Sequence, residues 1–271
     1  MNRGLIIKTV RETWLSTLLF GVGLFGVQWL LADILPVFYK DFSEHWLQVP
    51  FVRNILTAIL GEDMGGAIGP SAIVSGPWAH PLVLALTWAH SIMVLTRMPA
   101  TEIERGTIDM LLSLPVGRTR FYLCESIVGL AAGLGIMVAA VAGNIIGGRS
   151  AAQELRATPA QLAMVGANLY CLYVAVGGIA CLASSLCNRR GPAVGIVLGV
   201  LLTSFLLNYL APFDVFIKKM AVVSMLHYYR PLFVLKDAAW PISDMLVLVA
   251  VGALSWLAGA FVFARRDLCT V

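Results

Sequence analysis

Long stretches without charge constrain this chain more than any other feature of its sequence. Six stretches that lack Asp, Glu, Lys and Arg reach the length of about 20 largely apolar residues that a helix needs to cross a lipid bilayer. They are Thr13–Ala32, Met64–Thr96, Ser126–Gly148, Ala157–Asn188, Gly191–Phe213 and Met245–Ala264. The runs are continuously apolar rather than alternating, which excludes a transmembrane barrel. The sequence therefore predicts an all-α integral membrane protein with six transmembrane helices.

Composition agrees with this prediction and excludes several other classes of protein. The chain of 271 residues is 59% hydrophobic and 13% charged, whereas soluble domains are about 45–50% apolar and about 25% charged. That charge is too sparse to cover a water-soluble fold, so a cytosolic enzyme and a disordered chain are excluded. The net charge of +4 is too weak and too scattered for a phosphate-binding patch. We expect the lipid bilayer as a partner and no nucleic acid.

The expected spans divide the chain into one transmembrane domain, 1–271, with no linker. The second charge-free run is too long for one span and its first half is rich in glycine and proline, so we expect that helix to begin near Pro81. The predicted spans are residues 14–36, 81–99, 121–147, 160–187, 191–212 and 245–264.

The distribution of basic residues predicts that both termini lie in the cytoplasm. That orientation places 11 of the 19 Lys and Arg residues on the inner side: Arg3, Lys8, Arg11, Arg97, Arg105, Arg118, Arg120, Arg189, Arg190, Arg265 and Arg266. Lys218 and Lys219 argue against this orientation, because it places them on the outer side. Residues 1–13 have an amphipathic pattern, which predicts an interfacial helix before the first span. Apolar residues at helical spacing between Leu47 and Leu60 predict another in the first outer loop.

The inner loop between the second and third spans carries the most specific pattern. Thr101 followed by Glu104 matches a capping box, which predicts a short helix that ends near the Leu114–Gly117 turn. Gly106 costs such a helix about 1 kcal/mol relative to alanine, which suggests that another group approaches its backbone. An ordinary capped connector would have the same spacing.

The same loop resembles the region after the second span of ABC-2-type transporter permeases. The resemblance lies in Glu102-Ile-Glu104-Arg-Gly106-Thr107, in Leu111-Leu-Ser-Leu-Pro115 and in Arg118. The C-terminal run Phe263–Leu268 is similar to the usual ending of that family. Ser224-Met-Leu-His227-Tyr228 is similar to a Ser-x-x-His-Tyr element often found there. The Lys-Glu pair that relatives often have near the N-terminus is replaced here by Lys8-Thr-Val-Arg-Glu12.

The resemblance implies a permease subunit of an ATP-driven exporter in the prokaryotic cytoplasmic (inner) membrane. Two such subunits, identical or paralogous, would pair, and a separate cytoplasmic ABC ATP-binding subunit would dock on short coupling helices. The residues implied in coupling are Glu102, Glu104, Arg105, Gly106, Thr107, Pro115 and Arg118. The chain has no G-x-x-x-x-G-K-[ST] sequence. We therefore expect no cofactor on this chain and ATP only through the partner subunit.

Polar residues inside the predicted spans are candidates for a substrate pathway, because such groups are expensive in a bilayer. They include His90, Asn168, Thr203 and Asn208. Interhelical hydrogen bonding is the alternative interpretation. Glu125, at the inner end of the third span, is expected to form an interfacial ion pair.

Small residues at four-residue spacing predict close helix packing. The third span has Gly129/Gly133 and Gly143/Gly147, and the fifth has Gly191, Gly195 and Gly199. Packing within one bundle explains such faces, and a dimer seam on the fifth span is the alternative.

Two other functions remain open. An intramembrane enzyme would need paired catalytic groups at membrane depth, and the sequence contains neither H-E-x-x-H nor G-x-S-x-G. An ion-coupled carrier usually has buried charges or broken helices, and only His90 favours one here.

Overall fold

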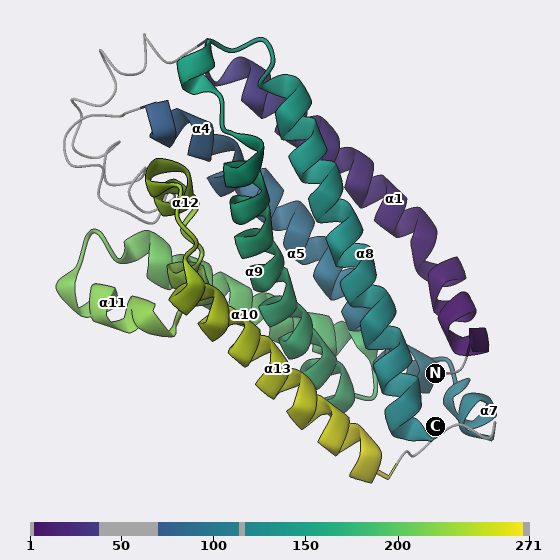
Figure 1. Cartoon of the computed structure of the whole chain (residues 1–271). Coiled ribbons are helices and arrows are strands. Elements are labelled where there is room, and N and C mark those ends of the chain that lie inside the picture. Colours follow the sequence, from purple (N-terminus) through teal and green to yellow (C-terminus); the bar gives the residue numbers. More distant parts are fainter. Residues whose placement is uncertain (1–2, 38–69, 114–116, 268–271) are drawn as a thin grey trace.

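The computed structural model describes residues 3–37, 70–113 and 117–267, and the regular elements in that part of the chain are all helical (Figure 1). The long helices are α1 (Arg3–Ile34), α5 (Pro81–Leu95), α8 (Arg118–Gly147), α9 (Pro159–Leu186), α10 (Arg190–Leu210) and α13 (Ile242–Arg265). The shorter elements are α4 (Pro70–Ala79), α6 (Ala100–Glu104), α7 (Ile108–Leu112), η2 (Gln153–Leu155), α11 (Val215–Met220), η3 (Ala221–Val223), η4 (Met225–Tyr228) and α12 (Pro231–Asp237).

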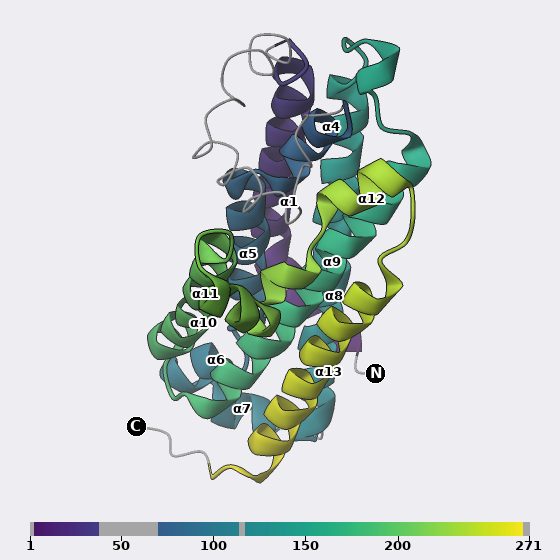
Figure 2. The same ribbon diagram turned by 90° about the vertical axis from the view of Figure 1, so that its left-hand side faces the viewer.

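Six helical segments in the described ranges are long and apolar enough to cross a membrane, which confirms the predicted number of spans. The chain is thus a multi-pass membrane protein by the length and composition of its helices. The start of α1 and the end of α13 lie at the same end of the bundle, together with α6 and α7 (Figures 1 and 2). We call this the N/C end, and the other the opposite end.

Helix α9 forms the centre of the bundle. In its most apolar stretch 72% of the residues are buried, against 17% to 22% in α1, α10 and α13. Helix α13 runs along α9, and α1 runs along α8 (Figure 1). The exposed apolar side chains of α1, α10 and α13 therefore form the lipid-facing surface, while the polar contacts between helices are made inside.

Two boundaries differ from the sequence-based prediction. Residues 3–34 form one continuous helix rather than an interfacial helix followed by a span, because no glycine or proline interrupts the chain between Leu5 and Phe20. Helix α5 begins at Pro81 as predicted, but α4 precedes it and lengthens this candidate span to residues 70–95. The interfacial helix expected between Leu47 and Leu60 falls outside the described residues.

Glycines allow two helix pairs to approach until their backbones touch. A Cβ atom on Gly143 would lie 2.2 Å from the carbonyl oxygen of Phe25, and one on Gly147 would lie 2.2 Å from that of Trp29. A Cβ on Gly178 of α9 would lie 2.1 Å from the carbonyl oxygen of Gly252 in α13. On the third span, the predicted Gly143/Gly147 face therefore packs within the bundle, against α1.

The glycine face of the fifth span behaves differently. A Cβ on Gly191, Gly195 or Gly199 would meet no atom within 4 Å among the residues that the structure describes. This side of α10 is therefore open within the single chain.

Candidate functional site

Residues 97–113, which join α5 to α8 and which we call the connecting segment, form two short helices instead of one. Gly106 separates α6 from α7 and has a φ of 68°, a left-handed conformation that ends helices and favours glycine. The predicted capping box is wrong, because Pro99 occupies the N-cap position and makes no side-chain cap. Gly106 therefore provides the backbone conformation that separates α6 from α7. It is not a close-packing position, since no described atom lies within 4 Å of its Cβ site.

Glu102 ties the connecting segment to α1. Its side chain is only 8% exposed, and one carboxylate oxygen lies 2.7 Å from Nζ of Lys8. The other oxygen accepts a hydrogen bond from the hydroxyl of Thr107, across the Gly106 break. One carboxylate therefore both binds the connecting segment to α1 and links the two sides of the Gly106 break.

The charges around Glu102 form a small network at the N/C end. Glu12 of α1 lies 3.4 Å from Lys8 and also pairs with Arg97, which follows α5. Burial raises the pKa of Glu102, but the hydrogen bonds from Lys8 and Thr107 and the charges of Lys8 and Arg97 outweigh it and hold the pKa below its ordinary value. The network therefore keeps Glu102 ionised at neutral pH.

Glu125 extends these contacts to α8. It accepts a hydrogen bond of 2.8 Å from the hydroxyl of Thr9. The expected surface ion pair is thus replaced by a buried neutral partner, while Arg120 is exposed. Helices α1 and α8 are joined by this bond at the same level as the Lys8–Glu102 contact.

Glu104 points to the other side of the segment and contacts α10. Its carboxylate accepts a hydrogen bond of 3.0 Å from the backbone amide of Arg190, at the start of α10. The Arg190 side chain in turn donates to the carbonyl oxygen of Met93 in α5, at 2.8 Å. The connecting segment thus contacts the ends of α1 and α10 through two carboxylates that face opposite ways.

The remaining residues implied in coupling lie on or near the surface. Arg105 is exposed. Met110 of α7, which is not one of the implied residues, is 74% exposed. Arg118 donates a hydrogen bond of 2.6 Å to the carbonyl oxygen of Arg266 after α13. Pro115 lies outside the described residues.

Four residues of this site were not identified as coupling residues from the sequence: Lys8, Glu12, Arg97 and Arg190. The spacing of Lys8 and Glu12, one helical turn apart, was the available signal. Their partners on the connecting segment are more than 80 residues away in the chain, and no local pattern encodes a contact of that kind.

His90 lies at the centre of a buried chain of hydrogen bonds. Its Nδ1 is 3.1 Å from the hydroxyl of Tyr173, which donates to the carbonyl oxygen of Gly129 at 3.0 Å. Its Nε2 is 3.2 Å from the hydroxyl of Thr17. His90 thus joins α5 to α1 and α9, as the interhelical interpretation predicts.

The other three pathway candidates lie apart from His90. Asn168 accepts a hydrogen bond of 3.2 Å from the amide of Arg230 and anchors the turn before α12. Thr203 is exposed, and its hydroxyl donates to Gly199 in its own helix. Asn208 is half-buried, near the end of α10. The structure does not bring these residues together into one polar path.

Comparison with known proteins adds no identification: no protein-family model matches the chain, and no curated protein is significantly similar to it. In the described residues no group of three or more His, Cys, Asp or Glu side chains could hold a metal ion. The function must therefore be argued from the fold and the network at the N/C end.

Proposed function

We propose that this chain is the permease subunit of an ABC-2-type ATP-driven exporter, with the connecting segment as its coupling element. The observation that carries the proposal is the position of that segment. It exposes α7 at the N/C end and is bonded to α1 by Glu102 and to α10 by Glu104. Both carboxylates belong to the stretch quoted for the family resemblance.

The geometry suits mechanical transmission. A displacement of α7 by an ATP-binding subunit would reach α1 through Thr107, Glu102 and Lys8, and α10 through Glu104. Helix α1 would carry the movement to α8, since their backbones touch at Gly143 and Gly147. Such packed helices move as rigid bodies rather than bending. Met110, exposed on α7, is the apolar contact that the proposed partner would cover.

A second permease copy, or a paralogue, fits the open face of α10. A Cβ on Gly191, Gly195 or Gly199 would meet no described atom within 4 Å, and small residues at this spacing let a second helix approach closely. In this arrangement both termini and the ATP-binding subunit lie in the cytoplasm, and the membrane is the prokaryotic cytoplasmic membrane.

The proposal is tested by ATP hydrolysis in the complex purified from the source membranes. Gly106→Val forces a β-branched residue into a left-handed conformation, and Glu104→Gln weakens the contact with α10. We expect both variants to assemble but to lower transport-coupled ATPase activity about 5-fold or more, the lower end of typical coupling between sites. Lys236→Gln, exposed at the opposite end, is the control. Full activity in both variants would refute the coupling role.

A further inference from the structure

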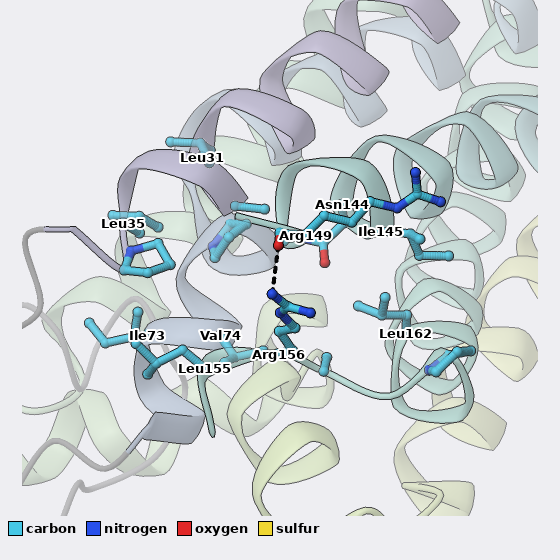
Figure 3. A pocket seen from close by; sticks show the side chains of 16 residues that line it. Leu31, Leu35, Ile73, Val74, Asn144, Ile145, Arg149, Leu155, Arg156 and Leu162 are labelled. Atoms are coloured by element: carbon cyan, nitrogen blue, oxygen red, sulfur yellow. Dashed lines mark hydrogen bonds between the residues drawn. The ribbon is translucent and has the colours of Figure 1, made fainter. Parts of the chain in front are cut away.

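A cleft at the opposite end of the bundle combines apolar walls with two arginines, Arg149 and Arg156 (Figure 3). Its volume is about 180 Å³, and it is lined by the ends of α1 and α8, the start of α9 and one side of α4. The apolar side chains include Leu31 and Leu35 of the α1 end, Ile73 and Val74 of α4, Ile145 of α8 and Leu162 of α9. None of the residues of the proposed coupling network lines it.

Arg156 is the arginine whose guanidinium lies inside this cleft. Figure 3 shows its guanidinium in the middle of the ring of lining side chains. Its Nε donates to the carbonyl oxygen of Ala151 at 2.7 Å and its Nη2 to that of Arg149 at 2.6 Å. Two backbone contacts thus hold the guanidinium in place and leave further N–H donors for a ligand.

The charged residues that line the cleft favour an anion, because they are Arg149 and Arg156, with no carboxylate among the described lining residues. In the part of the chain that the structure describes, neither Arg149 nor Arg156 forms an ion pair with a carboxylate. The nearby Asp33 accepts a hydrogen bond from Ser150 instead. Helix α9 begins at Pro159, which also lines the cleft, and the positive end of its dipole adds to the field of Arg156.

The size and depth of the cleft favour a lipid over a soluble molecule. Sites for whole small molecules usually measure about 300–1,000 Å³, so this cleft holds only part of a ligand. It lies at the level where three membrane-spanning helices begin or end, which is the level of lipid headgroups. Ile145, on its wall, is 37% exposed on the lipid-facing side of α8, so an acyl chain can leave along that helix.

We propose that this cleft binds the phosphate headgroup of an anionic glycerophospholipid. Arg156 donates charge-assisted hydrogen bonds to the phosphate oxygens. The glycerol and the first part of one acyl chain pack against the leucine and isoleucine side chains, and the rest of the lipid stays in the bilayer. The site is separate from the ATP-driven coupling proposed above and does not depend on it.

The test is a titration of the purified full-length chain in neutral detergent, followed by native mass spectrometry. The probes are phosphatidylglycerol, the neutral phosphatidylcholine, and sn-glycerol 3-phosphate as the soluble headgroup. We expect retention of phosphatidylglycerol, at least about tenfold weaker retention of phosphatidylcholine and none of glycerol phosphate. Arg156→Gln should weaken phosphatidylglycerol binding about tenfold, the size of one lost charge-assisted hydrogen bond.

Two further variants separate the site from general effects of charge and folding. Lys236→Gln removes one positive charge at the same end of the bundle, on an exposed residue outside the cleft, and should leave binding unchanged. Ala157→Leu narrows the cleft while keeping Arg156, and should weaken binding as Arg156→Gln does. Equal retention of both lipids, equal binding of glycerol phosphate, or wild-type binding in Ala157→Leu would overturn the proposal.

Discussion

Gly147→Leu is expected to destabilise the protein strongly, because it places a side chain where two helix backbones touch. Its Cβ would lie 2.2 Å from the carbonyl oxygen of Trp29 and 2.9 Å from the Trp29 Cα, so the backbones of α1 and α8 must separate. Overpacking a core usually costs about 1–3 kcal/mol of stability. We expect a loss at or above the upper end of that range, because the added side chain clashes with backbone atoms. The measurement is the apparent melting temperature and the yield of monodisperse protein in detergent.

Gly135→Leu, on the same helix α8, is the matched control for this prediction. The substitution is the same, also within a long helix, but no described atom lies within 4 Å of the Cβ site. Replacing a helical glycine by leucine should even favour the helix, by up to about 1 kcal/mol. We expect the Gly135 variant to melt at or above the wild-type temperature. Equal loss of stability in both variants would contradict the close α1–α8 contact.

Removing the positive charge of Lys8 is expected to have the next largest effect on stability. Lys8→Met leaves the nearly buried carboxylate of Glu102 without its closest cation. Breaking a fully buried pair costs about 3–5 kcal/mol, and since Lys8 is 28% exposed we expect about 1–3 kcal/mol after allowing for solvent screening. Glu102→Gln should cost less, because Lys8 keeps Glu12 at 3.4 Å. The double variant should recover part of the loss.

Thermal melts of the four proteins in this double-mutant cycle, with Arg11→Met as the exposed control on the same helix, give the coupling energy. The pH dependence supplies a second readout. Because the pKa of Glu102 is lowered in the folded protein, its contribution is fully present above its ordinary pKa of 4.5 and is lost as the pH falls below that value. Wild type should therefore lose more stability than Glu102→Gln on acidification. Additive effects and parallel pH profiles would rule out the Lys8–Glu102 coupling.

The long stretches without charged residues were enough to predict the six spans, because a bilayer tolerates few exposed charges over a stretch of about 20 residues. The glycine pair on α8 also followed from spacing, since contacts between helices repeat each turn. Local helix signals were less reliable. Thr101 and Glu104 have capping-box spacing but form no capping box. The structure has a capping box at Thr158 and Gln161 instead, at the start of α9. Pro159 directly after Thr158 favours the latter site, because proline suits the first helical position.

The candidate site was predictable only in part. The pattern around Glu102 and Gly106 marked the connecting segment, but the partners of Glu102 and Glu104 lie on α1 and α10. A contact between Lys8 and Glu102 depends on how α1 packs on α5 and α8, and that packing is set by glycines elsewhere in the chain. His90 illustrates the same limit, because its role follows from Thr17 and Tyr173, each more than 70 residues away.

Docking of an ATP-binding subunit on α7, the central claim, is tested most directly by site-specific photocrosslinking in the source membranes. A photoreactive amino acid replaces Met110, which is 74% exposed on α7, or Val223, which is 78% exposed beyond α10 at the opposite end. We predict that position 110 crosslinks to a polypeptide with a phosphate-binding G-x-x-x-x-G-K-[ST] loop and that position 223 does not. Absence of such a polypeptide at position 110, or equal crosslinking from both positions, would contradict docking at α7.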